Sequence, residues 1–198
     1  MKKVYLSLLF TLGFGFLFSQ TSDYLHFNQK RLNTTKTAMT VLGTWAVGNI
    51  AVGSVLQSRK TGEDKYFHQM NALWNGVNLA LAGGALYSIS RTDPAAFGLY
   101  ETFNEQQKIQ KILLFNAGLD VGYMSYGLYL RERSKHFSDP VKADKRRGWG
   151  KSIILQGAFL FVFDLGTYFV LAGNNEDLQR ILEGFSFDGT GVGWRMRF

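Results

Sequence analysis

The stretch FNAGLDVGYMSYGLYL, residues 115–130, decides the fold, because its sixteen residues contain a single charged side chain, Asp120. No Lys or Arg accompanies this acid, and the charge-poor segment extends back to Ile112. A helix needs about 20 predominantly apolar residues to cross the hydrocarbon core of a bilayer. The stretch therefore predicts a membrane-spanning helix that carries one isolated carboxyl group.

Three further segments share this pattern and length, and Asp164 is the only charged residue in them. Chance spacing of 22 basic and 15 acidic residues would rarely leave four such gaps. We therefore predict an all-α fold, a four-helix transmembrane bundle over residues 37–175. The predicted spans cover residues 37–58, 66–90, 112–130 and 152–175.

The loops between these spans predict the orientation. Basic residues gather in the first and third loops, residues 59–65 and 131–151, whereas the longer second loop carries few. The positive-inside rule puts the first and third loops in the cytoplasm, in a multi-pass protein of the cytoplasmic (inner) membrane with both termini outside. The same loops explain the net charge of +7. Nucleic-acid binding is not expected, since no groove-reading motif accompanies the charge.

The N-terminus has the features of a signal peptide. Lys2 and Lys3 precede an apolar stretch, residues 4–18, that is about 22 Å long as a helix and shorter than the hydrocarbon core. Ser19 is small enough for cleavage before Gln20. We expect a signal peptide at residues 1–19 and an external segment at 20–36. An uncleaved anchor helix is the alternative.

The rest of the composition sets limits on the chemistry. The absence of cysteine excludes disulfides, thiolate metal sites and cysteine nucleophiles. The mean hydropathy of −0.06 is low for a membrane protein. We attribute it to the charged loops and to Asn and Gly within the spans. The external C-terminal tail, residues 176–198, ends in an alternating pattern around an Asp-Gly-Thr-Gly turn, which predicts a β-hairpin.

The two halves of the chain show a weak internal repeat. Asn49 and Asp120 occupy matching places, each five residues before a serine, and Asn75-Gly76 corresponds to Gln156-Gly157. This match favours two pseudo-repeated helical hairpins related by an axis along the membrane normal.

Polar residues within the spans fall on shared helix faces and near one depth, counting about 1.5 Å per residue from the charged ends. We therefore predict a polar cluster near the membrane midplane. It consists of Asn49, Asn71, Asn75, Asn78, Asn116, Asp120, Tyr123, Gln156, Asp164 and Tyr168.

Two interpretations of this cluster remain open. An Asp at the centre of a spanning helix costs about 2.5 to 3.5 kcal/mol, so both acids should face the bundle interior. The first interpretation is packing, in which polar groups bond across helices and glycines allow close approach. The glycines expected in that role are Gly43, Gly48, Gly76, Gly83, Gly84, Gly118 and Gly122. The second is a proton or cation site, or a path for a small solute.

The histidines and glycine-rich motifs add little chemistry. His68 and His136 both lie at the cytoplasmic end and could approach each other as a metal or haem pair. No HExxH motif or carboxylate cluster supports ligation, and GTGVG at 189–193 lacks the features of a phosphate loop. We therefore expect no catalytic residue, metal or cofactor.

Several stretches resemble a family of small bacterial four-helix integral membrane proteins, an uncharacterised domain of unknown function. They are GTWAVGNIAVG (43–53), KYFHQMNALWNGVN (65–78), NAGLDVGYMSYGLYLRER (116–133) and GWGKSIILQGAFLFVFDLGTY (148–168). The resemblance covers about residues 38–172 and includes His68, Asp120 and Asp164. It implies the four-helix membrane fold and implies no activity.

Together these features predict a non-enzymatic structural or accessory subunit of a bacterial envelope complex. Its expected partners are the lipid bilayer and either a second copy or a larger membrane complex. The alternative is a small transporter, or a proton- or cation-coupled carrier, that uses Asp120 and Asp164. A water-filled interior cavity reaching the two acids would favour the carrier, and a packed centre would favour the subunit.

Overall fold

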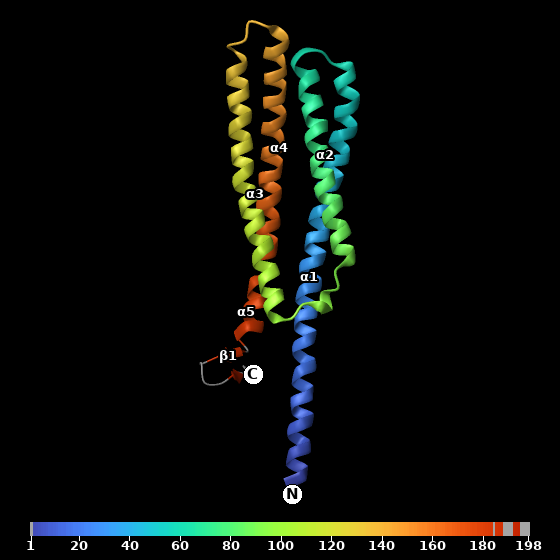
Figure 1. The fold of residues 1–198 in the computed structure, drawn as a ribbon, viewed down its shortest axis with the longest axis vertical. Helices are drawn as coiled ribbons and strands as arrows, with labels where there is room; N and C mark the ends of the chain where they lie inside the picture. Colours follow the sequence, from blue (N-terminus) through green and yellow to red (C-terminus); the bar gives the residue numbers. More distant parts are fainter. Residues whose placement is uncertain (1, 184, 188–191, 195–198) are drawn as a thin grey trace.

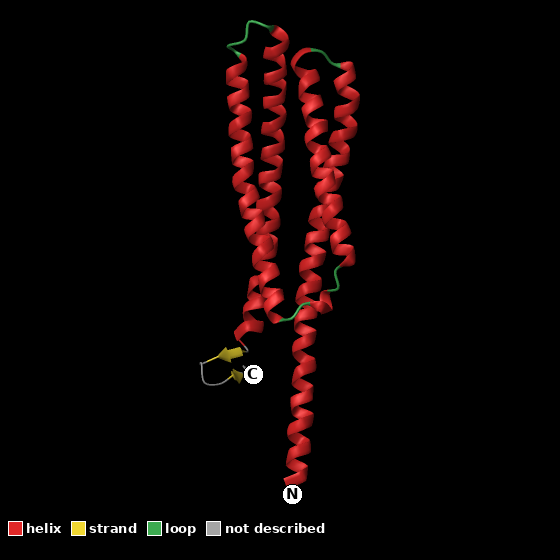
Figure 2. Cartoon of the chain, viewed as in Figure 1, coloured by secondary structure: helices red, strands yellow, loops and turns green. Residues whose placement is uncertain are grey.

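The chain is described by a computed structural model that covers residues 2–183, 185–187 and 192–194, with side chains described for residues 24–179. The predicted all-α character is confirmed, since four long helices account for most of the described chain (Figure 2). In chain order the elements are α1 (Lys2–Arg59), α2 (Gly62–Arg91), the 3-10 turn η1 (Pro94–Ala96), α3 (Leu99–Ser134), α4 (Pro140–Ala172), α5 (Asn175–Glu183), β1 (Phe185–Phe187) and β2 (Val192–Trp194).

The four long helices form two antiparallel hairpins, α1 with α2 and α3 with α4, that lie side by side (Figure 1). The main interface between the hairpins is α2 against α4, whereas α1 touches α3 and α4 only lightly. Both chain termini lie at the same end of the molecule (Figure 1). In the C-terminal tail, β1 and β2 pair antiparallel, with Phe185 opposite Trp194.

The helices run without interruption because proline is confined to their starts. The chain has two prolines, and Pro94 and Pro140 each open a helix, where the missing N–H costs nothing. Asp139 caps α4 by accepting a hydrogen bond from the Val141 amide at 2.9 Å. The tight α1–α2 connection depends on Gly62, whose φ of 56° lies in the left-handed region.

Helix α1 is continuous across three segments that the sequence analysis treats as separate. It includes the predicted cleavage point after Ser19 and the whole predicted external segment, residues 20–36. Contact with the bundle is already established at Phe27, which is 3% exposed. Residues 24–32 are therefore the first bundle turns of α1. Cleavage of the signal peptide remains a prediction.

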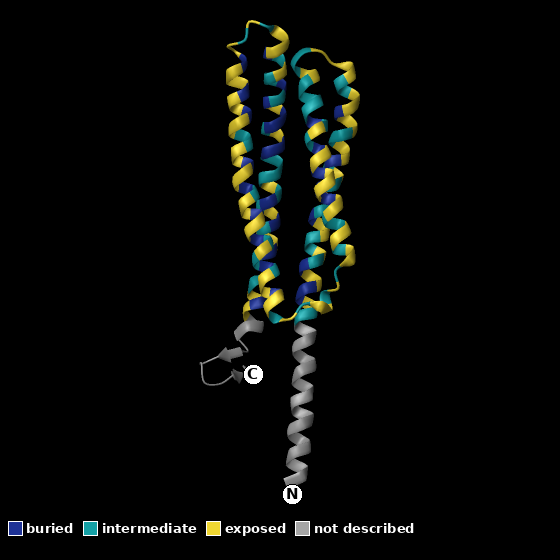
Figure 3. Ribbon diagram, viewed as in Figure 1, coloured by how far each residue is buried: buried dark blue, intermediate teal, exposed yellow. Residues whose placement is uncertain are grey.

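Buried positions follow the inner faces of the helices (Figure 3), and the buried residues include many more polar ones than a water-soluble bundle would bury. Among the residues whose side chains are described, fifteen polar or charged residues are buried, against twelve hydrophobic ones. Large apolar side chains are exposed on all four helices, including Val55 at 49%, Val77 at 61%, Phe115 at 68% and Val162 at 70%. The interior is therefore unusually polar, and much of the outer surface is apolar.

Within the described residues, two helical stretches, Tyr24–Arg59 and Pro140–Gln179, are long and apolar enough to cross a membrane. Helices α2 and α3 fall short of that criterion, although four spans are predicted. Their mean hydropathy is lowered by the buried asparagines of α2 and by the buried Gln106, Gln110 and Asp120 of α3. Because these polar side chains point into the bundle, they lower the mean hydropathy of each helix without making its outer face more polar.

The prediction of which glycines bring helices together is wrong. A Cβ added at Gly48, Gly76, Gly83, Gly84, Gly118 or Gly122 would meet no other part of the bundle within 4 Å, and at Gly43 only the Ala82 methyl at 3.6 Å. Close approach occurs instead between Gly127 and Gly150, where a Cβ on Gly150 would lie 2.5 Å from the Gly127 carbonyl oxygen. The GxxxG pair of α3 points outward, because residue type alone does not tell which face packs.

Candidate functional site

The centre of the bundle holds a closed circuit of hydrogen bonds that joins three helices. The Trp45 indole N–H donates to Gln156 Oε1 at 3.2 Å, and Gln156 Nε2 donates to Asn71 Oδ1. Asn71 Nδ2 in turn donates to Asn49 Oδ1 at 2.8 Å, and Asn49 Nδ2 donates to the Trp45 carbonyl at 2.8 Å. We call these four residues the amide ring. It ties α1 and α2 of one hairpin to α4 of the other.

Burial explains why the amide ring is closed. Gln156 is 0% exposed and Asn71 is 3% exposed, so an unpaired amide in either would carry the full desolvation penalty. Both side chains use their oxygen and their nitrogen within the ring. The Trp45 indole is held flat against Phe159, with ring centroids 3.9 Å apart and planes 5° apart. Each amide oxygen and nitrogen of these two residues thus has a partner within the ring.

The asparagines of α2 extend the amide ring along one helix face. Asn75 Nδ2 donates to the Asn71 carbonyl at 2.8 Å, and Asn78 Nδ2 donates to Asn75 Oδ1 at 3.3 Å. All three are buried, as expected for residues that are four and seven positions apart on a single inward face. Asn71 belongs to the ring, and the other two form a branch from it.

The two acids meet each other and not the amide ring. Asp120 of α3 and Asp164 of α4 are 2% and 6% exposed, and each carboxyl group lies in the electrostatic surroundings of the other. Within the described side chains, Asp120 Oδ2 accepts no hydrogen bond from an amide, hydroxyl or indole group, and no ion pair involves either acid.

The remaining predicted cluster members lie apart from both groups. The Tyr123 ring meets Trp74 edge-on at 4.9 Å and links α3 to α2, whereas Tyr168 packs edge-on against its neighbour Phe169. Asn116 is half-buried. Asp164 lies eight residues beyond Gln156 on α4, about 12 Å along the helix. The predicted cluster members therefore fall into an amide ring and an acid pair, with Asp120 packed beside Gly157 and Asp164 farther along α4.

The two predicted histidines have different surroundings. His68 is half-buried, packs edge-on against Phe67, and has a buried Nδ1 without a hydrogen-bond partner. His136 is exposed in the turn that follows α3. Among the residues that the structure describes, no three His, Asp or Glu side chains gather as a metal site would require.

A second polar layer, which the sequence reading missed, lies at the end of the bundle that holds the termini. Asn28 Nδ2 donates to Thr102 Oγ1 at 2.8 Å, and Arg31 Nη2 donates to Asn28 Oδ1 at 2.9 Å. Arg31 also lies 3.9 Å from Glu105 and over the Phe97 ring. Burial lowers the pKa of Arg31, while the Glu105 carboxylate opposes that shift. We call Asn28, Arg31, Thr102 and Glu105 the terminal polar layer.

The same end ties α3 to the end of α4. Gln106 Nε2 donates to the Leu171 carbonyl at 2.8 Å, and Gln110 Nε2 donates to Asn175 Oδ1 at 2.8 Å. Thr102, Gln106 and Gln110 are all buried and are spaced four residues apart. This spacing in the sequence marks one polar face of a helix, although the sequence does not indicate that the face is buried.

Two grooves open along the side of the bundle between α1 and α4. The larger has a volume of about 720 Å³ and the smaller about 480 Å³, and Val41 lines both. Neither groove has Asp120 or Asp164 among its lining residues. These grooves therefore do not supply the water-filled path to the acids that a carrier would need.

Comparison with known proteins identifies a family for the part of the chain that forms this polar interior. A family model described as "Family of unknown function (DUF6992)" matches residues 41–165, well over half of the chain. No curated protein and no solved structure matches the chain. The predicted resemblance to a domain of unknown function is thus confirmed. The chain belongs to the DUF6992 family, and the matched residues contain both the amide ring and the acid pair.

Proposed function

We propose that the chain is a four-span integral protein of a bacterial inner membrane and a non-enzymatic structural or accessory subunit of an envelope complex. The observation that carries this proposal is the distribution of side chains, with amides and acids inside and valine, leucine and phenylalanine outside. Soluble monomers rarely expose contiguous apolar patches larger than a few hundred Å². Lipid tails provide the apolar surroundings that such a surface needs.

The apolar outer surface supports membrane spans in all four long helices, and not only in the two that are most hydrophobic. Leu73 and Leu81 of α2 are 60% and 62% exposed, and Phe115 and Leu128 of α3 are 68% and 56% exposed. The moderate overall hydropathy of α2 and α3 comes from residues that bond inside the bundle, as the Asn71–Asn75–Asn78 face does. In a membrane, interior polar groups of this kind contribute to helix association.

The charges at the loop end support the positive-inside orientation. At the end opposite the termini, Arg147 pairs with Glu63 at 3.4 Å. Lys145 lies 4.6 Å from the centre of the Trp149 ring, and Arg146 lies over the Phe137 ring. Basic residues beside aromatic rings suit the cytoplasmic interface of a bilayer. The termini, after removal of residues 1–19, would then lie outside.

A packing role for the interior supports a subunit and not an enzyme. The amide ring leaves no amide group of Gln156 or Asn71 free to act on a ligand. The outward Gly118 and Gly122 of α3 leave a smooth strip on which a second copy or another membrane helix can pack. This arrangement fits a protein that functions by associating with other membrane proteins.

The experiment that tests the location uses the absence of cysteine. Single cysteines replace Thr61, Ala96 and Ser138, and intact cells are treated with a membrane-impermeant maleimide. We expect the label on Ala96→Cys in intact cells, and on Thr61→Cys and Ser138→Cys only after permeabilisation. Carbonate extraction should leave the protein in the membrane fraction, and its mature N-terminus should be Gln20. Release into buffer without detergent would refute the proposal.

The alternative carrier function is supported by the acid pair, because two buried carboxyl groups share one site without a basic partner in any described ion pair. Purified protein is placed in liposomes that contain a pH-sensitive dye, and Asp120→Asn and Asp164→Asn are compared with the parent. The subunit proposal predicts equal proton leak for all three proteins. Proton or cation flux that either substitution abolishes would favour the carrier.

A further inference from the structure

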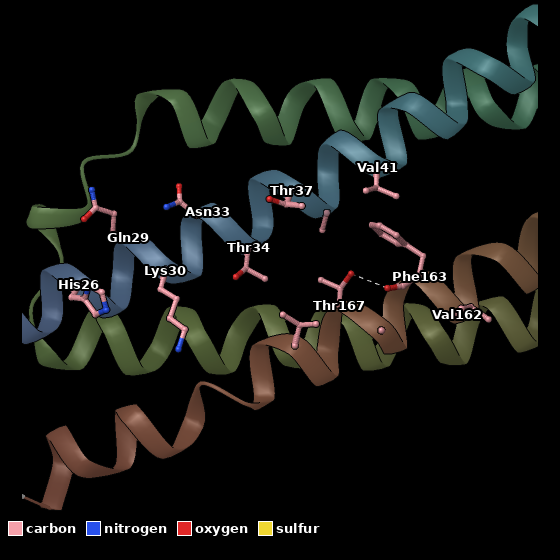
Figure 4. A pocket seen from close by; sticks show the side chains of 13 residues that line it. His26, Gln29, Lys30, Asn33, Thr34, Thr37, Val41, Val162, Phe163 and Thr167 are labelled. Carbon is pink, nitrogen blue, oxygen red and sulfur yellow. Dashed lines mark hydrogen bonds between the residues drawn. The ribbon is translucent and has the colours of Figure 1, made fainter.

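We propose that the lateral grooves between α1 and α4 bind one phospholipid, with its phosphate at Lys30 and an acyl chain along Val41 and Phe163. The inference rests on the proposed membrane location. The larger groove has one wall from residues 26–41 of α1 and the other from residues 162–170 of α4 (Figure 4). Figure 4 shows Lys30 and Thr34 reaching from α1 towards α4, and Phe163 reaching from α4 towards Val41.

The polarity of the groove changes along the helix axis. The end near the termini is lined by His26, Gln29, Lys30, Asn33 and Thr34, all of which carry polar side chains. Val170 of α4 lies opposite this end, and Thr37 and Thr167 line the middle of the groove. The deeper part is lined by Val41 and Val162, with Phe163 beside them. An occupant that fits both parts must have a polar head and an apolar tail. The gradient also runs in the proposed direction of the bilayer normal, from the outer interface inward.

The length of the combined grooves fits one leaflet. Beyond Val41 the smaller groove continues along Trp45, Gly48 and Phe159. Lys30 and Trp45 are fifteen residues apart on α1, which is about 22 Å along the helix. Half of a bilayer with its headgroups is also about 20–22 Å thick. A lipid phosphate at Lys30 would therefore bring the end of its chain to the level of Trp45.

The charge at the polar end favours a phosphate. The Lys30 side chain is 46% exposed and its ammonium group lies 3.0 Å from an Asp177 carboxylate oxygen, so the ammonium can contact an additional anion from the open side. Thr34, on the same side of α1, supplies a neutral hydrogen-bond donor (Figure 4). A diacylglycerol would fill the apolar part equally but would leave the ammonium without its phosphate. The groove thus discriminates for a phospholipid head.

The test measures lipid retention by the detergent-solubilised full chain, using native mass spectrometry with added phosphatidylglycerol or diacylglycerol. Gly166→Leu fills the groove, since Gly166 lines it and an added Cβ meets nothing within 4 Å. Gly83→Leu is the matched control, because it is equally open and lies on α2. We expect phosphatidylglycerol affinity to fall about tenfold in Gly166→Leu and to stay at the parent value in Gly83→Leu.

The head is tested by Lys30→Gln, with the exposed Lys36→Gln as control on the same helix. We expect about a three- to fivefold loss for Lys30→Gln with phosphatidylglycerol and no change with diacylglycerol. Asp177→Asn breaks the same ion pair without removing the cation, and should bind phosphatidylglycerol at least as well as the parent. Circular dichroism confirms that each variant is folded.

Equal retention of phosphatidylglycerol by the parent, Gly166→Leu and Lys30→Gln would overturn the inference, and so would equal affinity of the parent for both lipids. Either result leaves the proposed function intact if the parent still fractionates with membranes. A parent that is folded in buffer without detergent would overturn the membrane location itself.

Discussion

At the scale of single residues, the amide ring shows how polar side chains can hold a bundle whose outside is apolar. Gln156 accepts from Trp45 and donates to Asn71, so one side chain connects both helices of the first hairpin to α4. In an apolar environment the alternative to such bonds is an unpaired amide. The loss of one member would therefore leave each of its two neighbours in the ring without one hydrogen-bond partner.

Gln156→Leu should destabilise the protein by about 1–2 kcal/mol, because it leaves Asn71 Oδ1 without a donor and the Trp45 N–H without an acceptor. The free energy of unfolding is measured by titrating detergent-solubilised protein with a denaturing detergent. Thr44→Val serves as control, since its exposed hydroxyl bonds only to the Thr40 carbonyl of its own helix. A loss no greater than in this control would show that the ring contributes little.

The residue scale also shows what the sequence could predict. The spacing of Asn71, Asn75 and Asn78 indicates one shared face, and the structure buries that face. The sequence put Asp120 and Gln156 in one cluster on the basis of shared helix faces and of depth counted from the charged ends of the spans. The actual partners depend on which helices are neighbours, and that information is long-range.

At the scale of helices, the charge-free stretches of the sequence indicate where a helix is apolar, but they do not indicate where the helix begins and ends. The predicted span 112–130 lies inside α3, which runs from Leu99 to Ser134, because Glu, Gln, Lys and Arg are good helix formers. The Gly127–Gly150 contact shows that the sequence also does not identify which glycines lie between packed helices. Glycines occur on every face of these helices, and only the fold decides which of them are buried.

Gly127→Ala should destabilise the protein by about 1–3 kcal/mol, because the added Cβ would lie 2.7 Å from the Gly150 carbonyl oxygen. Gly118→Ala is the matched substitution on the same helix. It meets no atom of another helix within 4 Å and should be neutral or stabilising by up to about 1 kcal/mol. Thermal unfolding in detergent compares the two. The reverse order of stability would contradict the observed helix faces.

Asp139→Ala should weaken the start of α4 by about 1 kcal/mol, because the Val141 and Lys142 amides lose the carboxylate that caps them. Hydrogen exchange should become faster in the first turn of α4 and stay unchanged at its centre. Ser138→Ala, next to the cap and exposed, is the control. Equal exchange in the two variants would contradict a capping role.

At the scale of the whole molecule, the protein consists of two hairpins joined through α2 and α4. The covalent link between them is short and runs through η1 (Pro94–Ala96) at the end of the molecule that carries the termini (Figure 1). The sequence predicted two hairpins from a weak repeat, but their pairing through α2 and α4 depends on contacts far apart in the chain.

Cutting the chain after Ala96 should therefore leave two fragments that reassociate when they are produced together. We expect an affinity tag on residues 1–96 to recover residues 97–198 from detergent extracts, because the α2–α4 interface and the amide ring remain intact. Recovery should fall when the second fragment carries Gln156→Leu. Fragments that enter the membrane but never co-purify would contradict this division of the molecule.

The two polar layers also constrain movement. Helix α1 carries Asn28 in the terminal polar layer and Asn49 in the amide ring, about 32 Å apart along its axis. Inserting one residue at Thr37 would turn one contact point by about 100° relative to the other, so both could not be satisfied together. A helix fixed at two heights can neither slide nor swivel separately. Any rearrangement of this molecule must therefore carry α1 and its neighbours as one rigid body.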